Sequence, residues 1–213
     1  MNFPDIPPTL EGISDLINLL RGPNGCPWDK KQTANSLTGH LIEECYELVE
    51  AIEKKDYNNI NEEIGDVILN VVYQIIFLKE VLDIDEQSII KDLYAKIKIR
   101  HPHVFSDINL KNAADVEQNW EKIKDDSNVN LANNKDIPKY LPSLSLALKL
   151  QKKMPPQDIN QSYDLIDSLL SNKDSLDSES LGKLLFAIVS IAKIKNIDPE
   201  KSLRMHNNYI NKN

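Results

Sequence analysis

The chain has few of the residues that mark secreted, nucleic-acid-binding or membrane-spanning proteins. Its 213 residues include only two cysteines, too few for a disulfide framework, which favours a reducing, cytoplasmic compartment. The formal net charge of −8 argues against a nucleic-acid-binding surface, because such a surface needs a basic stripe. The richest apolar stretch, 67–78, is interrupted by Asn70 and Gln74 and is too short to span a membrane. The N-terminus has no basic start followed by an apolar run, so we expect no signal peptide.

Alternating strand patterns are also nearly absent, and helical periodicity dominates the sequence. Breakers such as the run 22–25 and Pro102 interrupt it, and Asp85 and Asp198 are typical N-cap residues. We therefore predict an all-α helical bundle. It comprises a first helical region at 1–125, a polar linker at 126–142 and a second helical region at 143–213. The expected helices cover 10–21, 36–55, 60–82, 85–100, 113–124, 144–153, 163–170, 180–195 and 198–210.

A short repeat supports two related copies of one helical unit. Residues 62–68 (EEIGDVI) resemble residues 179–185 (ESLGKLL). Each stretch leads into an apolar helix and then into an Ile-Asp pair, at 84–85 and at 197–198. We predict that the second region repeats the packing of the first.

Two groups of acids stand out in the first region. Glu43, Glu44 and Glu47 fall in the helix expected at 36–55, and Glu63 and Asp66 fall in the helix expected at 60–82. Glu44 and Glu47 are three residues apart, as are Glu63 and Asp66, so each pair projects from one helical face. The ordinary interpretation of such pairs is a solvated acidic surface.

The apolar residues of the two helices argue against that interpretation. Those of the 60–82 helix cover nearly its whole circumference, so we expect it to be buried, with its acids facing other protein or an enclosed cleft. On the 36–55 helix, Glu44 lies at the edge of the apolar arc and Glu47 just beyond it, whereas Glu43 points further toward solvent. Cys45 falls within this arc, where we expect a small core residue. The polar stripe of the 60–82 helix comprises Glu63, Asp66, Asn70 and Gln74.

Carboxylates packed this closely need protons or cations. Two unit charges about 5–6 Å apart repel by roughly 3 kcal/mol at an effective dielectric of 20, and several such pairs rival the stability of a domain, about 5–15 kcal/mol. Hard oxygen ligands without a nearby Cys or His set favour Mg²⁺, with Mn²⁺ as the alternative, over Zn²⁺. Di-iron bundles take a Glu-x-x-His from each of two helices, and no such pairing occurs among these acids, so iron is disfavoured.

The order and spacing of these acids resemble the all-α nucleoside triphosphate pyrophosphohydrolases, and more specifically the MazG family. Three further segments match that family in the same order: Gly-Cys-Pro-Trp-Asp at 25–29, Arg-His-Pro-His-Val-Phe at 100–105 and Trp-Glu-x-Ile-Lys at 120–124. Residues 137–144 also resemble the join between the family's two copies. The resemblance implies hydrolysis of a nucleoside triphosphate to the monophosphate and pyrophosphate, a reaction suited to housekeeping of the nucleotide pool.

By position, the resemblance makes Glu44, Glu47, Glu63 and Asp66 the ligands of magnesium. The carboxylate that acts as general base and takes a proton from the attacking water is then Glu47 or Glu43, and the sequence does not choose between them.

The resemblance also implies a set of substrate-binding residues. Lys96 and Arg100 lie one turn apart, where they would steady the phosphates, and His40 stands where related proteins carry a basic residue. Two further substrate-binding candidates come from the residues themselves: Asn70, from the polar stripe, and Trp28, whose ring can stack on a base. For His40 a plain surface histidine is an open alternative, and for Trp28 a structural anchor is one.

The second copy departs from the family pattern at the metal positions. Ser180 and Lys183 stand where the first copy has Glu63 and Asp66, and 164–168 stands in place of the Glu-Glu-x-x-Glu motif. Because a lysine reverses the charge at a ligand position, we predict a copy that keeps its packing and has lost the metal site. The resemblance and the abundant apolar helical faces also predict a homodimer. The alternative function is a non-catalytic helical protein-interaction module whose acids hold structural cations.

Overall fold

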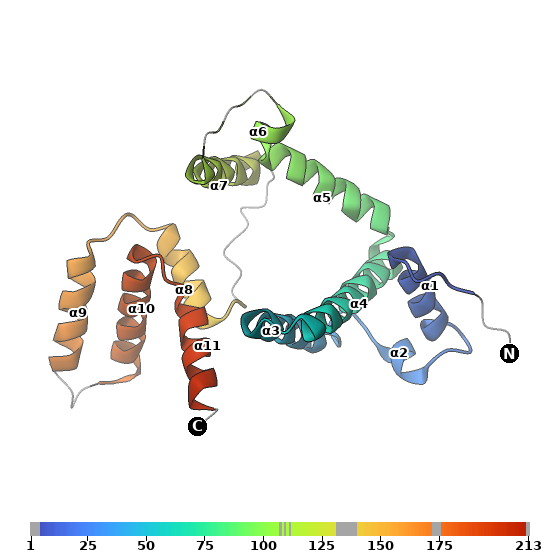
Figure 1. Ribbon diagram of the computed structural model, residues 1–213, viewed down its shortest axis with the longest axis horizontal. Helices are drawn as coiled ribbons and strands as arrows, with labels where there is room; N and C mark the ends of the chain where they lie inside the picture. The colour runs from blue at the N-terminus through green and yellow to red at the C-terminus, as the bar shows by residue number, and fades with distance from the viewer. Residues whose placement is uncertain are drawn as a thin grey trace. The chain divides into compact units, whose positions relative to one another are not determined.

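The computed structural model describes residues 5–106, 108, 110, 112–130, 140–171 and 176–211. Every regular element among these residues is an α-helix, so the all-α prediction is confirmed (Figure 1). The chain divides into two compact units, Met1–Ile123 and Lys124–Asn213, and each is described by itself. None of the helices in the described ranges is both long and apolar enough to cross a membrane.

Helices α3 (Thr38–Lys54) and α4 (Tyr57–Leu82) form a hairpin at the centre of the first unit. Lys55 closes α3 in the left-handed conformation, with φ of 58°. The carboxylate of Asp56 accepts a hydrogen bond from the backbone N–H of Asn59 (3.3 Å) and so caps α4. This tight turn reverses the chain, and the two helices pack against each other in antiparallel directions.

Helix α1 (Leu10–Arg21) packs on α4 and completes the core of this unit. Its Ile17 is only 1% exposed and meets Leu37, which precedes α3. The α4 residues in the same core are Val72, Tyr73, Ile76 and Phe77. The core therefore lies along the C-terminal half of α4, which leaves the N-terminal half, with Glu63 and Asp66, outside it.

A five-residue helix, α2 (Pro27–Lys31), follows α1 and lies outside the helices expected from the sequence. Five residues are too few to show an apolar period, which is why the sequence pattern missed it. The chain turns sharply between α1 and α2. The backbone comes so close to itself there that a Cβ atom on Gly25 would lie 2.0 Å from the carbonyl oxygen of Leu20. Only glycine fits this turn without displacing the backbone.

Helices α5 (Glu86–Arg100), α6 (Pro102–Phe105) and α7 (Ala113–Asn130) follow the hairpin. The expected end of the helix at Arg100 is observed, and α6 is a single extra turn that begins at Pro102. Helix α7 continues to Asn130, past its expected end at 124 and into the predicted linker 126–142. Residues 125–130 contain neither Gly nor Pro, so nothing in them stops the helix. Residues 131–139 of that linker lie outside the described residues.

The second unit contains α8 (Ser143–Lys152), α9 (Ile159–Ser171), α10 (Ser178–Ile194) and α11 (Pro199–Ile210). Helix α10 packs on both α8 and α9, and α11 packs on α8. The side chain of Gln151 is buried between α8 and α10, where its amide nitrogen donates to the carbonyl oxygen of Phe186 (2.7 Å). Val189 of α10 is fully buried.

The two units contain the same kind of turn after their long apolar helix. Helix α4 ends in Asp83 at φ 54°, and α10 is followed by Asn196, also at φ 54°. In each case an isoleucine comes next, and then an aspartate whose carboxylate caps the following helix: Asp85 accepts from Ser88 N (2.8 Å), and Asp198 from Lys201 N (3.0 Å). The Ile-Asp pairs of the sequence repeat thus lie in equivalent turns.

The expected burial of α4 on all sides is wrong for this chain taken by itself. Ile64 is 45% exposed and Val71 is 44% exposed, because α1 and α3 cover only part of the circumference of α4. On α3, Cys45 is exposed rather than part of the core, and Ile42 is 52% exposed. The hairpin therefore carries an uncovered apolar surface alongside its acids.

Candidate metal centre

Three carboxylates from the two helices of the hairpin meet in one cluster. Glu44 projects from the second turn of α3, and Glu63 and Asp66 project from the facing part of α4. One ligand oxygen of each lies within 4.8 Å of the others, and all three residues are half-buried. Within the described ranges, no other group of three His, Cys, Asp or Glu side chains places its ligand atoms this close.

The electrostatics of the cluster disfavour full ionisation. Burial raises the pKa of Glu44 above its ordinary value of 4.5, and the charges of Asp66 and Glu47 raise it further. Burial is also the largest cause that raises the pKa of Glu63, and the charge of Glu47 is the second. A divalent cation relieves this repulsion, and a set of carboxylate oxygens suits a hard ion such as Mg²⁺. The donor set therefore fits the predicted ion.

The remaining two acids lie at the edge of the cluster. Glu47 is exposed, and a hydrogen bond between its side chain and that of Glu63 further raises the pKa of Glu63. The side chain of Glu43 is 63% exposed, and its Oε2 lies 3.9 Å from Nδ1 of His40. Glu44, Glu63 and Asp66 thus form the centre, with Glu47 beside it and Glu43 on the solvent side.

Trp28 and His40 lie side by side near the start of α3. Their rings meet edge to face with centroids 6.3 Å apart, and Trp28 is 53% exposed. His40 precedes Glu44 by one helical turn, about 6 Å along the axis. Trp28 is thus half exposed and stays a predicted substrate-binding residue, with a structural anchor as the alternative.

The side chain of Asn70 is buried and makes a hydrogen bond within its own helix. The residue is 7% exposed, and its Nδ2 donates to the backbone carbonyl of Asp66 (3.0 Å). This hydrogen bond lies one turn from the acids on the same helix. Asn70 therefore supports the backbone behind Asp66, and its role as a substrate-binding residue stays a prediction.

Lys96 and Arg100 lie on α5, away from the acids in sequence. Lys96 is exposed, and the guanidinium carbon of Arg100 lies 5.4 Å from the ring centroid of Trp120. Among the described side chains, no ion pair joins Lys96 or Arg100 to the acid cluster. The structure therefore places Arg100 beside an aromatic ring rather than on the carboxylates.

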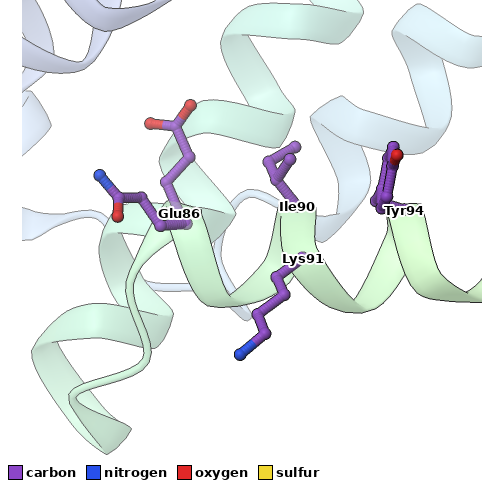
Figure 2. A pocket seen from close by; sticks show the side chains of 5 residues that line it. Glu86, Ile90, Lys91 and Tyr94 are labelled. Atoms are coloured by element: carbon purple, nitrogen blue, oxygen red, sulfur yellow. The ribbon is translucent and has the colours of Figure 1, made fainter.

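Helix α5 also borders a surface hollow of about 400 Å³. Figure 2 shows Glu86, Ile90 and Tyr94 rising from one side of the helix, with Lys91 directed to another. Its lining residues all come from α5 and include none of the predicted site residues. The hollow is therefore not part of the candidate metal centre.

The structure also shows three functional candidates that the sequence pattern did not reveal. Asp29 is 8% exposed, and its carboxylate accepts a hydrogen bond from the hydroxyl of Tyr73. Arg21 donates from Nη1 to the carbonyl oxygens of Asp29 (2.7 Å) and Gln32 (3.1 Å). Asp29 and Tyr73 are separated by 44 positions, so no local pattern links them.

In the second unit, the stretch that resembles 62–68 in sequence carries an ion pair, and no group of three acids like that in the first unit occurs among its described residues. Lys183, at the position of Asp66 in the repeat, donates from Nζ to Glu179 Oε1 at 2.6 Å. That hydrogen bond and the charge of Glu179 raise the pKa of Lys183 above its ordinary value. Ser180, at the position of Glu63, has its backbone N–H capped by Asp177 (2.8 Å).

Fold and site together define a class of protein: an all-α chain with a carboxylate cluster on a helical hairpin. Residues 32–105, which contain that hairpin, match the family model described as the MazG nucleotide pyrophosphohydrolase domain. The chain is 35% identical to the nucleoside triphosphate pyrophosphohydrolase/pyrophosphatase MazG of Thermotoga maritima, over 91% of this chain and 79% of that protein. It is 31% identical to the nucleoside triphosphate pyrophosphohydrolase of Escherichia coli K12, over 93% of this chain and 82% of that protein.

The chain therefore belongs to the MazG family of nucleotide pyrophosphohydrolases, and the resemblance seen in the motifs is confirmed. It is accordingly an enzyme of the hydrolase class. The chain is also 39% identical to the uncharacterized protein YabN of Bacillus subtilis, over 90% of its own length but only 42% of that protein.

Proposed function

We propose that the protein hydrolyses nucleoside triphosphates to nucleoside monophosphates and pyrophosphate in a reaction that depends on Mg²⁺. The observation that carries the proposal is the meeting of Glu44, Glu63 and Asp66 within 4.8 Å. Two relatives that match most of the chain are named nucleoside triphosphate pyrophosphohydrolases, which supports this substrate class. The reaction suits housekeeping of the nucleotide pool in the cytoplasm.

In this mechanism Glu44, Glu63 and Asp66 hold the cation, with Glu47 as the fourth ligand or as the base. When bound, Mg²⁺, or Mn²⁺ in its place, supplies charge neutralisation for the phosphate oxygens. Water attacks the α-phosphorus, the bond from that phosphorus to the bridging oxygen breaks, and pyrophosphate leaves with the electron pair. Glu47 or Glu43 takes the proton of the attacking water.

The substrate groups are proposed to lie on either side of the acids. Trp28 is half exposed and stands beside His40, which itself lies one turn before Glu44. We therefore propose that the ring of Trp28 stacks on the nucleobase. Lys96 and Arg100 are proposed to steady the phosphates. The net charge of −8 makes such local cationic groups necessary for a polyphosphate substrate.

A product assay tests the proposal. Each nucleoside triphosphate is incubated with protein and Mg²⁺, and pyrophosphate and orthophosphate are measured separately. Pyrophosphate release that is lost on Glu44→Gln and on chelation of the metal supports the proposal. Orthophosphate release would change the reaction class. Metal-induced stabilisation without any turnover would support a non-catalytic helical protein-interaction module that holds structural cations.

We also propose that the protein is a homodimer. Ile42, Ile64 and Val71 on the hairpin are 44–52% exposed, and helix α5 has no buried residue, with Ile90 52% exposed. Uncovered apolar faces of this kind mark protein–protein contacts. Sedimentation equilibrium at micromolar concentration distinguishes a dimer from a monomer.

The second unit is proposed to be a related copy without a metal site. The equivalent turns at Asp83 and Asn196 support a shared origin. The ammonium of Lys183, paired with Glu179, supplies a fixed positive charge at the position of Asp66. A cation would be repelled there, so the unit is proposed to contribute packing alone. The corresponding domains are a catalytic region at 1–125 and a second region at 143–213.

A further inference from the structure

The short helix α2 carries Trp28 but has little stability of its own. It contains five residues, and its N-cap residue, Cys26, makes no side-chain capping hydrogen bond. Helices shorter than about 12–15 residues are marginal in water, so tertiary contacts must fix this one. The position of Trp28 therefore depends on whatever anchors α2.

The anchors lie on α4 and α1. The buried carboxylate of Asp29, adjacent to Trp28, accepts a hydrogen bond from the hydroxyl of Tyr73, which is 5% exposed. Further along the same segment, Gln74 Nε2 donates to the carbonyl oxygen of Ala34 (3.2 Å). Two successive residues of α4 thus hold the segment that leads into α3 at two points, Asp29 and Ala34.

Arg21 provides the second set of anchors. Its Nη1 donates to the carbonyl oxygens of Asp29 and Gln32, at 2.7 and 3.1 Å. Its guanidinium is held in turn by Glu80, at 2.9 Å from Nη2 to Oε2, and lies 4.6 Å from the ring centroid of Phe77. A planar guanidinium that is bound on both edges and stacked on a ring is oriented rigidly.

We infer that Tyr73, acting through Asp29, is a positioning residue that holds Trp28 in the base-binding wall beside His40. Helix α4 then has two roles, since it carries Glu63 and Asp66 and also fixes Trp28 through Tyr73, about two turns after Asp66. This inference rests on the proposed function, because it assigns the base contact of the same site. It extends the proposal by naming the residues that set the distance between the base contact and the metal centre.

Tyr73→Phe removes the hydroxyl and keeps the ring, and Tyr57→Phe on the same helix is a matched control at a position 77% exposed. In a Trp120→Phe background, Trp28 is the single tryptophan, so its fluorescence anisotropy and acrylamide quenching report its mobility. We expect Tyr73→Phe to lower the anisotropy and increase quenching. It should raise KM for the triphosphate about tenfold with kcat nearly unchanged, the loss expected for one hydrogen bond to a charged group. Tyr57→Phe should change neither reading.

A double-variant comparison separates positioning from general destabilisation. If Tyr73 acts through Trp28, then Trp28→Ala raises KM by at least as much, and adding Tyr73→Phe to it raises KM no further. Multiplicative effects on KM, or unchanged anisotropy in Tyr73→Phe, would overturn the inference. Asp29→Asn keeps an acceptor for the hydroxyl and should restore what Asp29→Ala loses, which keeps the test decisive if Tyr73→Phe folds poorly.

The outcomes also separate this inference from the proposed function. Pyrophosphate release by the unaltered protein, with Trp28→Ala leaving KM unchanged, would overturn the inference alone. Absence of turnover in the unaltered protein would overturn the proposed function and the base-binding role together, and the anisotropy would then decide only whether Tyr73 anchors Trp28.

Discussion

Replacing Glu44 by glutamine should change the stability of the protein in opposite directions with and without Mg²⁺. Without a cation, the substitution removes one negative charge from a cluster whose ligand oxygens lie within 4.8 Å. The protein should become more stable. With Mg²⁺ present, the same substitution removes a ligand, so most of the stabilisation by the metal should be lost.

The magnitude follows from the separation of Glu44 and Asp66. Two unit charges 4.8 Å apart repel by about 3.5 kcal/mol at an effective dielectric of 20 and by about 0.9 kcal/mol in bulk water. Because both side chains are half-exposed, we expect a gain of about 1–2 kcal/mol, or roughly 2–8 °C in Tm for a chain of this size. A cation at one hundred times its Kd stabilises the wild type by about 2.7 kcal/mol, which the variant forfeits as its affinity falls.

Thermal or urea unfolding of both proteins, in EDTA and in Mg²⁺, measures the two effects. Glu50→Gln is the control, because it makes the same change six residues along the same helix, where Glu50 pairs with Lys54. The control should respond to Mg²⁺ as the wild type does. A Glu44→Gln variant that is destabilised in EDTA, or that gains as much from Mg²⁺ as the wild type, would refute the reasoning.

Three further outcomes follow from the structure. The raised pKa values of Glu44 and Glu63 mean that the folded state binds protons more tightly than the unfolded chain, so in EDTA the free energy of unfolding should fall as the pH rises from 4.5 through the raised values. Urea titrations of the wild type against Glu44→Gln measure this contribution, and an equal pH dependence in both would contradict it. Asp164→Asn in the second unit should leave kcat within about twofold of the wild type, because the change lies outside every proposed site; loss of activity equal to that of Glu44→Gln would show a second working site. Val71→Lys places a charge on the exposed apolar face of α4, so it should shift sedimentation from dimer toward monomer, and an unchanged dimer would place the interface elsewhere.

Much of the fold could be predicted because the helix boundaries have local chemical signals. The sequence predicts Asp85 and Asp198 as N-caps, and the carboxylate of each accepts the expected backbone hydrogen bond. The sequence predicts more burial of α4 than is observed, because apolar residues around nearly the whole circumference are typical of a helix that is covered on all sides. Residues such as Val71 remain exposed in the single chain, since the sequence does not say which surfaces another chain covers.

For the candidate site, the i, i+3 spacing of Glu63 and Asp66 predicted that they share a face, and the structure brings Glu44 to them. Helical periodicity is sufficient for such residues because a hairpin brings together two faces that the pattern already defines. The buried pair of Asp29 and Tyr73 could not be predicted in this way. It depends on a five-residue helix docking onto α4, a contact between distant segments that leaves no periodic signal.

The identity of the released phosphate tests the central claim most directly. With Mg²⁺ and a nucleoside triphosphate labelled at the γ-phosphate, the account predicts that the label leaves in pyrophosphate, with the nucleoside monophosphate formed in equal amount, and that Glu44→Gln abolishes the release. Release of labelled orthophosphate with the diphosphate as the other product, or equal activity of the Glu44→Gln variant, would contradict it.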